Sequence, residues 1–159
     1  MKKQKICFDT STICSLFDNS QNTPVVVRLF DFLDRNPESF NLFASPIFYI
    51  EVNQSQQKLF NVITAFLATS TIVSLPYSLN AVQLTESYLK KQVLTENHWG
   101  DLAHIAYASV SSCDYFISCD RKHIVRKNTI DSVKNINTQQ NIFVPQIVTP
   151  STFLEIQND

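Results

Sequence analysis

Short apolar runs alternate with longer amphipathic segments along most of the chain, and this alternation constrains the fold more than any other feature. Parallel strands that helices cover on both faces read as continuous apolar runs, whereas amphipathic helices show one apolar face. The alternation therefore predicts an α/β fold, with a central parallel sheet in a three-layer α/β/α domain. Strands are expected at residues 5–9, 42–44, 71–75, 114–119 and 143–148.

Proline and capping residues mark where some of the intervening helices begin. Ser45-Pro46 and Thr149-Pro150 each combine a capping side chain with a proline that the first helical turn tolerates. The segment 130–141 is mostly polar and gives only weak helical signals. Other helices are expected at residues 10–19, 24–36, 59–66, 79–91 and 99–113.

Length and composition fit one domain with its own core. The chain has 159 residues, of which 44% are hydrophobic and 17% charged, and no repeat or linker divides it. We therefore expect a single domain spanning residues 1–159. The net charge of −1 means that any nucleic acid must be held by local basic groups and metal.

Cysteine usage and hydropathy indicate a soluble chain. The four cysteines form no CxxC pair, so buried reduced thiols are expected rather than disulfides or a zinc site. No apolar run approaches the roughly 20 residues of a membrane span. We expect a cytoplasmic protein with no membrane contact.

The chain contains a single glycine, Gly100. Both the GxGxxG turn of dinucleotide-binding folds and the GxxxxGK[ST] loop need several glycines where the backbone approaches phosphate. Nucleotide binding through either motif is therefore excluded.

Four acidic residues occupy positions that suggest one shared site. Asp9 and Asp120 each end an apolar run, Glu51 lies in an apolar helical segment, and Asp101 opens the helical segment 101–106. If the two runs are neighbouring parallel strands, their carboxylates emerge at the edge where open α/β sheets bind ligands. Carboxylates that share a pocket repel each other, and a divalent cation relieves the repulsion. The pattern indicates metal-assisted hydrolysis, with a phosphodiester as the natural substrate.

Each of these acids also has a purely structural interpretation. Asp9 and Asp120 could cap the helices that follow their strands, and Asp101 suits the positive end of a helix dipole. A solvated helix face would explain Glu51, but its neighbours are apolar and a charge there requires a partner. The joint occurrence of all four favours a site over four separate caps.

Several blocks of the sequence resemble the PIN-domain family, and more narrowly the VapC-type toxins of type II toxin–antitoxin pairs. The run DLAHIAYA followed by DYFISCD is the most specific of them. Many members of the family carry Asn at the position of Asp120, where this chain keeps the acid. The blocks that carry the resemblance are residues 6–11, 45–52, 101–108, 114–120, 122–124 and 147–155.

The resemblance implies a PIN-like ribonuclease that uses Mg²⁺ or Mn²⁺, binds a small antitoxin and forms a homodimer. By analogy, Asp9, Glu51, Asp101 and Asp120 correspond to the acidic quartet that holds the metal. Ser118 matches a Ser/Thr position that hydrogen-bonds near the quartet. In such a site, a water made more acidic by the metal attacks the phosphorus.

Further side chains near these blocks have two interpretations each. Arg121, Lys122 and Arg126 follow Asp120 and form either an RNA-phosphate patch or a solvated helix face. His104 lies three residues after Asp101 and either supports a metal-bound carboxylate or packs against a backbone carbonyl.

Two other functions compete with the ribonuclease. A haloacid-dehalogenase-like phosphatase also begins with a strand-end aspartate, but it needs a second aspartate where this chain has Ser11. A non-catalytic PIN-like module would only dock RNA or protein, and would have no reason to keep four mutually repelling carboxylates.

Overall fold

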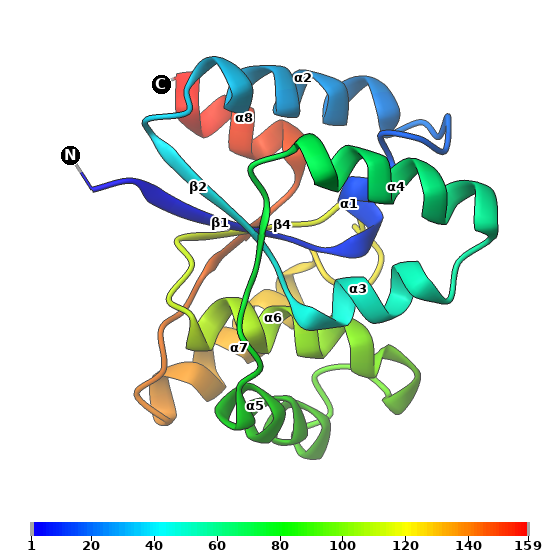
Figure 1. Ribbon diagram of the computed structural model, residues 1–159. Helices are drawn as coiled ribbons and strands as arrows, with labels where there is room; N and C mark the ends of the chain where they lie inside the picture. The colour runs from blue at the N-terminus through cyan, green and yellow to red at the C-terminus, as the bar shows by residue number, and fades with distance from the viewer. Residues whose placement is uncertain (1, 159) are drawn as a thin grey trace.

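The structure is a computed structural model that describes residues 2–158, so residues 1 and 159 of the expected domain lie outside the described residues. Its centre is a five-stranded parallel sheet in the order β3-β2-β1-β4-β5 (Figure 1). Because the chain adds β2 and β3 on one side of β1 and then β4 and β5 on the other, the strand order reverses beside β1. Such a reversal is where open α/β sheets bind their ligands. The strands are β1 (Gln4–Phe8), β2 (Phe40–Ala44), β3 (Val73–Ser74), β4 (Tyr115–Ile117) and β5 (Gln146–Val148).

The strand register aligns the carboxyl ends of four strands. Phe8 of β1 pairs with Ala44 of β2 on one side and with Ile117 of β4 on the other. Ile117 in turn pairs with Val148 of β5. The residue that follows each strand therefore lies on one edge of the sheet. These residues are Asp9, Ser45, Ser118 and Thr149.

Helices cover both faces of the sheet, which confirms the three-layer α/β/α architecture (Figure 1). One face carries α2 (Thr23–Arg35), α4 (Gln57–Thr69) and α8 (Pro150–Asn158). The opposite face carries α5 (Leu79–Lys90), α6 (Trp99–Val110) and α7 (Lys127–Gln139). At the carboxyl edge, α1 (Thr10–Cys14) follows β1 and α3 (Pro46–Asn53) follows β2, while a short 3-10 helix, Glu96–His98, leads into α6.

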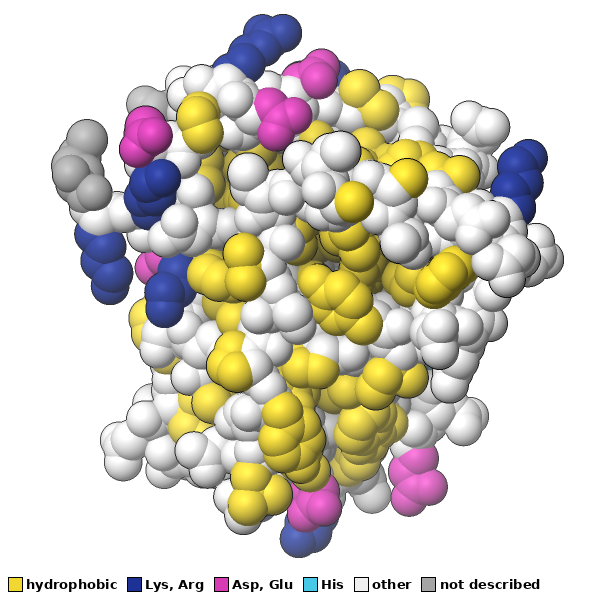
Figure 2. Space-filling view, in the orientation of Figure 1, with side chains coloured by type: hydrophobic (Ala, Val, Ile, Leu, Met, Phe, Trp, Pro, Cys, Tyr) yellow, Lys and Arg dark blue, Asp and Glu magenta, His cyan; other side chains and the backbone are white. Residues whose placement is uncertain are grey.

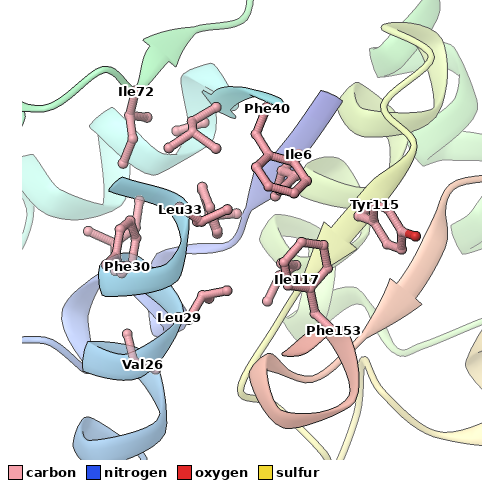
Figure 3. Close-up of a cluster of buried hydrophobic side chains, with 14 of the residues drawn as sticks. Ile6, Val26, Leu29, Phe30, Leu33, Phe40, Ile72, Tyr115, Ile117 and Phe153 are labelled. Atoms are coloured by element: carbon pink, nitrogen blue, oxygen red, sulfur yellow. The ribbon is translucent and has the colours of Figure 1, made fainter. Parts of the chain in front are cut away.

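Each face of the sheet has its own apolar cluster, because successive strand residues point to opposite faces. Ile6 and Phe8 of β1 belong to the cluster beneath α2 and α8, whereas Cys7 belongs to the cluster on the α6 side. Figure 3 shows Leu29 of α2 and Phe153 of α8 converging on the first of these clusters. The two cores hold β1 rigidly at the centre of the domain.

The observed elements differ from the expected ones mainly in length. The strand expected at 71–75 is only β3, because it pairs with β2 at just two positions. The helix expected at 10–19 ends at Cys14. The weakly helical segment expected at 130–141 is the full helix α7, whose last turn buries Asn137.

A buried polar network joins α5, α6 and α7. Asn137 is fully buried, and its side-chain nitrogen donates to Ser109 Oγ at 3.0 Å and to the carbonyl of Phe143 at 2.8 Å. Its oxygen accepts a hydrogen bond of 2.6 Å from the hydroxyl of Tyr88, which is also buried. Burial raises the pKa of Tyr88 to about 12, so the phenol remains a donor at neutral pH. Every polar atom of the Asn137 amide is thus satisfied within the core.

The four cysteines are free thiols, as expected. Cys7 and Cys113 are buried, whereas Cys14 and Cys119 are only half-buried, so burial was correctly predicted for two of the four. Burial raises the pKa of Cys14 to about 11, and this thiol is therefore protonated at neutral pH.

Large apolar side chains remain exposed on the face that carries β3 and the neighbouring helices (Figure 2). Tyr77 and Leu79 are exposed by 73% and 60%, and Val73 and Ile50 by more than half. Exposed apolar patches commonly mark surfaces that another protein covers. Within residues 2–158, no helix has the length and apolar character needed to cross a membrane.

Candidate active site at the carboxyl edge of the sheet

Asp9 lies at the end of β1 and is 3% exposed. Its Oδ1 accepts hydrogen bonds from the backbone N–H of Thr12 at 3.0 Å and from the Thr12 hydroxyl at 2.6 Å. Its Oδ2 accepts from Ser11 Oγ at 2.7 Å and from Ser118 Oγ at 2.6 Å. Asp9 therefore does cap α1, but it is also held in place by a hydroxyl from the end of β4.

Glu51 reaches the same edge from α3. Its Oε2 accepts hydrogen bonds from the hydroxyl of Thr10 and from His104 Nε2, the latter at 3.1 Å. Burial alone would raise the pKa of Glu51, but the hydrogen bond and charge of His104, together with the bond from Thr10, bring it below its usual value. Glu51 is therefore a carboxylate at neutral pH.

Gly100 leaves the space that Glu51 needs. A Cβ atom at this position would lie 2.7 Å from Glu51 Oε1, closer than real Cβ atoms approach an oxygen. Gly100 has no positive φ and lies in the first turn of α6, so no backbone conformation requires a glycine there. The close approach of the carboxylate explains why this position lacks a side chain.

His104 is a buried side chain that connects the end of β2 with Glu51 of α3. It is 1% exposed, and its Nδ1 lies 2.8 Å from Ser45 Oγ, just after β2. Because a carboxylate only accepts, Nε2 carries the hydrogen toward Glu51, and in the neutral ring Nδ1 accepts from Ser45. The alternative bond to a backbone carbonyl is not formed. Ser45 correspondingly makes no side-chain capping bond to α3, although its position there is that of the N-cap.

Asp101 in the first turn of α6 is influenced by the other aspartates. Its Oδ2 lies 2.9 Å from His98 Nδ1. Burial raises the pKa of Asp101, and the negative charges of Asp120 and Asp9 raise it further, while His98 partly offsets these effects. The three aspartates therefore lie close enough for their charges to interact.

Asp120 is held in a turn after β4. Its Oδ1 accepts from the backbone N–H groups of Lys122 and His123 at 2.9 and 2.8 Å, and its Oδ2 lies 3.1 Å from His123 Nδ1. Ser118 Oγ accepts the N–H of Asp120 at 3.0 Å while donating to Asp9, so one hydroxyl positions both acids. Asp120 caps this turn rather than a helix, because α7 begins only at Lys127.

The arrangement fits a divalent cation in its chemistry but does not form a finished metal site. Within residues 2–158, no Lys or Arg forms an ion pair with any of the four carboxylates; the ion-pair partners of Glu51, Asp101 and Asp120 are histidines. Mg²⁺ and Mn²⁺ prefer such oxygen donors. However, the described residues contain no group of three or more His, Cys, Asp or Glu side chains placed to hold a metal ion.

The basic residues do not form one continuous patch. Arg121 and Lys122 are exposed and line the same cavity, next to Asp120 in sequence. Arg126 is exposed at the N-cap of α7 and does not line this cavity. Their assignment to RNA remains a prediction, as does the role of His104 and Ser118 beside the acids.

Sequence analysis did not identify Thr10, Ser45, His98 or His123 as partners of the acids. Thr10 and Ser45 could have been suspected, because a hydroxyl residue beside a strand end lies at the ligand edge. The pairing of His98 with Asp101 and of His123 with Asp120 is a three-residue spacing that brings side chains together. The rings of the two histidines also lie against each other, with centroids 4.1 Å apart and planes tilted by 36°.

Two solved structures resemble this chain over nearly its whole length. One is VapBC2 from Rickettsia felis bound to a DNA fragment from their promoter, with 15% sequence identity, a TM-score of 0.57, and coverage of 92% of this chain and 98% of that chain. The other is VapBC-1 from nontypeable Haemophilus influenzae, with 16% identity, a TM-score of 0.60, and coverage of 93% and 99%. No protein-family model and no curated protein matches the chain. At such low identity the likeness establishes the fold, and the expected PIN-like fold is confirmed.

Proposed function

We propose that this chain, which has the PIN-like fold of the VapBC toxins, is a metal-dependent endoribonuclease and the toxin of a toxin–antitoxin pair. The proposal is supported by three observations: Asp9 and Asp120 follow the neighbouring strands β1 and β4, Glu51 bonds to Thr10 beside Asp9, and the charges of Asp120 and Asp9 act on Asp101. None of the four acids has a Lys or Arg partner among the described residues. A structural role would be satisfied by capping and would not require Asp120 and Asp9 so near Asp101 that, beside its burial, their charges raise its pKa.

In this proposal the four carboxylates hold Mg²⁺ or Mn²⁺. When bound, such an ion lowers the pKa of water and neutralises charge on a phosphodiester. Ser118 and Thr12 fix the carboxylate of Asp9, and His104, itself fixed by Ser45, orients that of Glu51. Arg121, Lys122 and Arg126 would bind phosphates of the RNA on either side of the cleaved bond.

The proposed partners are an RNA substrate, a small antitoxin and a second copy of the chain in a homodimer. We also propose that the protein acts in the cytoplasm. Both similar structures are of VapBC pairs, and this supports an antitoxin partner. Each of these protein partners would cover apolar surface, which this domain exposes around Tyr77 and Leu79. Light scattering of the purified chain, alone and with the product of a neighbouring gene, would test both assemblies.

A nuclease assay tests the proposal. The purified chain would be incubated with total RNA in Mn²⁺, in Mg²⁺ and in EDTA, and thermal unfolding would be followed in the same three buffers. We expect cleavage and a higher Tm with either metal, and neither effect in EDTA. A module that only docks RNA would show no metal-dependent cleavage and no Mn²⁺ stabilisation. A phosphatase would instead release phosphate from small phosphomonoesters and leave RNA intact.

The substitution Gly100→Ala is expected to reduce RNA cleavage by about 10- to 100-fold. The new methyl group would push the Glu51 carboxylate from its present position, and a displacement of about 1 Å can cost two orders of magnitude in rate. Stability should fall little, because alanine favours a helix over glycine by about 1 kcal/mol and so offsets part of the clash. Ser87→Ala on α5 is a suitable control on a second helix, and cleavage by Gly100→Ala at the wild-type rate would contradict the assignment of Glu51.

A further inference from the structure

A surface cavity of about 560 Å³ lies directly beside the proposed catalytic edge. Three of its lining residues surround Asp120 in sequence, and one of them, Lys122, donates its backbone N–H to Asp120 Oδ1 at 2.9 Å. The opposite wall comes from the start of α2 and from Ser151 of α8. The lining residues are Gln21, Asn22, Val25, Cys119, Arg121, Lys122 and Ser151.

The charge of this cavity suits a polyanion. Its lining contains Arg121 and Lys122 and no acidic residue, whereas a second cavity lined by Lys3 also contains Asp34 and Glu38. Arg121 and Lys122 form no ion pair with another described residue. The guanidinium of Arg121 is instead steadied by a hydrogen bond of 3.2 Å to Ser151 Oγ. Two cations without acidic partners among the described residues thus stand next to Asp120.

The other lining groups are those that recognise a nucleobase. Asn22 occupies the N-cap position of α2, but its side chain makes no capping bond, so its amide remains available to a ligand. Asn and Gln amides each present a donor and an acceptor side by side, the pattern with which proteins read base edges. Val25 and Cys119 supply apolar surface for a base. A volume of this size lies within the range of about 300–1,000 Å³ that is usual for ligand pockets.

We propose that this cavity is a nucleotide subsite, in which Arg121 and Lys122 bind a phosphate and Gln21 and Asn22 read the base of a nucleotide next to the cleaved bond. The inference rests on the ribonuclease function for the location of the cleaved bond, but the binding of single-stranded RNA is a property that can be measured without cleavage. It assigns sequence preference to the loop that precedes α2, where Gln21 and Asn22 lie 12 and 13 positions after Asp9 in sequence. Single-stranded RNA is the expected form, because its bases are free to leave the stack and enter a pocket.

Binding in EDTA separates this subsite from catalysis. The binding of the whole chain to labelled RNA hexamers would be measured by fluorescence anisotropy. One pool of hexamers has a random sequence, and each of four others has one of the four bases fixed at a chosen position. We expect wild type to prefer one base over the others by about 10-fold, within the range of one specific base contact. The double variant Gln21→Ala/Asn22→Ala should lose this preference while keeping its affinity for the random hexamer within about 3-fold. Arg121→Ala should weaken all five hexamers about equally and make binding less dependent on salt.

Matched controls are available on other surfaces. Asn80→Ala/Gln83→Ala removes the same two side-chain types from a different cavity, and Arg28→Ala removes an exposed arginine from α2. Both should bind like wild type. Circular dichroism and thermal unfolding would verify that every variant is folded.

The outcomes of this binding test and of the cleavage assay are distinguishable. Equal base preference in wild type and in the Gln21→Ala/Asn22→Ala variant, or absence of RNA binding by wild type, overturns the subsite even if the chain cleaves RNA. Loss of preference in that variant alone supports the subsite, and it does so even if cleavage is never observed and the ribonuclease proposal fails.

Discussion

Asp101→Asn is expected to lower metal-dependent RNA cleavage by about 1,000-fold or more while leaving the fold intact. The amide is nearly the same size as the carboxylate, and its oxygen can still accept the hydrogen bond from His98. It carries no negative charge, however, and is a poor ligand for Mg²⁺. The rate of cleavage of a labelled RNA in Mn²⁺ would measure the effect, with Asp131→Asn on α7 as the control at an exposed aspartate.

The same variant should be more stable than wild type when no metal is present. In the folded chain the pKa of Asp101 is raised by burial and by the charges of Asp120 and Asp9, so the ionised form destabilises the fold. For wild type this penalty is present at neutral pH and disappears as the pH falls through the raised folded pKa toward the unfolded value of about 3.9. We therefore expect a higher Tm for Asp101→Asn in EDTA at pH 7, and a difference that shrinks on acidification. Asp9→Asn should abolish cleavage in the same way.

Loss of fold in either variant would contradict this expectation. It would show that the aspartate is needed chiefly as a cap. For Asp101 this is a sharp test, because among residues 2–158 its carboxylate bonds to His98 and accepts no hydrogen bond from a helix N–H. Normal cleavage by a folded Asp101→Asn variant would remove Asp101 from the proposed metal site.

Asn137→Leu is expected to destabilise the domain by about 3 kcal/mol or more, which corresponds to a fall in Tm of about 10 °C. Leucine has the same number of side-chain heavy atoms with the same branching and is somewhat larger, so no cavity is created. The substitution instead removes the 2.6 Å hydrogen bond of the buried Tyr88 hydroxyl, which keeps only a 3.5 Å contact to Ser109 Oγ, and the bond to the part-buried carbonyl of Phe143. Each unsatisfied buried group costs about 1–3 kcal/mol. Urea unfolding would give the change in free energy directly.

Two further variants define the origin of that loss. Asn135→Leu lies on the exposed side of the same helix and should change stability by less than about 0.5 kcal/mol. Adding Tyr88→Phe to Asn137→Leu should recover part of the stability, because it removes a buried hydroxyl whose remaining contact, to Ser109, is long. If the double variant is no more stable than Asn137→Leu, the loss arises from packing around α7 and not from the polar network.

The order of strands and helices could be predicted from the sequence because local patterns carry it. Runs such as Ile6 to Phe8 are apolar at successive positions, which is typical of a parallel strand that is buried on both faces. The ends of β3 could not be predicted, because its length depends on how far β2 pairs with it, and that is decided 30 residues away in sequence. The polar segment that becomes α7 was only a weak signal, since Asn137 reads as a surface residue until its partners Tyr88 and Ser109 are known.

The acids of the candidate site could be predicted, but their partners could not. A strand-end position is visible locally, which is why Asp9 and Asp120 were recognisable. The bond between His104 and Ser45 joins residues 59 positions apart and depends on the packing of α6 beneath β2. The distances between the acids depend on side-chain orientation as well, and the tight metal cluster that the family resemblance implies is not formed among residues 2–158.

The central position of β1 also determines when the domain can acquire its proposed activity during synthesis. The hydrogen bond from Ser118 to Asp9 cannot form until Ser118 has been synthesised, 109 positions later in the chain. At about 5–20 residues per second, a ribosome needs roughly 5 to 20 seconds to supply it. During that interval β1 lacks the neighbour β4, and Asp120 does not yet exist. If the chain is a ribonuclease, a growing copy cannot cut the messenger that encodes it, and the antitoxin need only capture chains that are nearly complete.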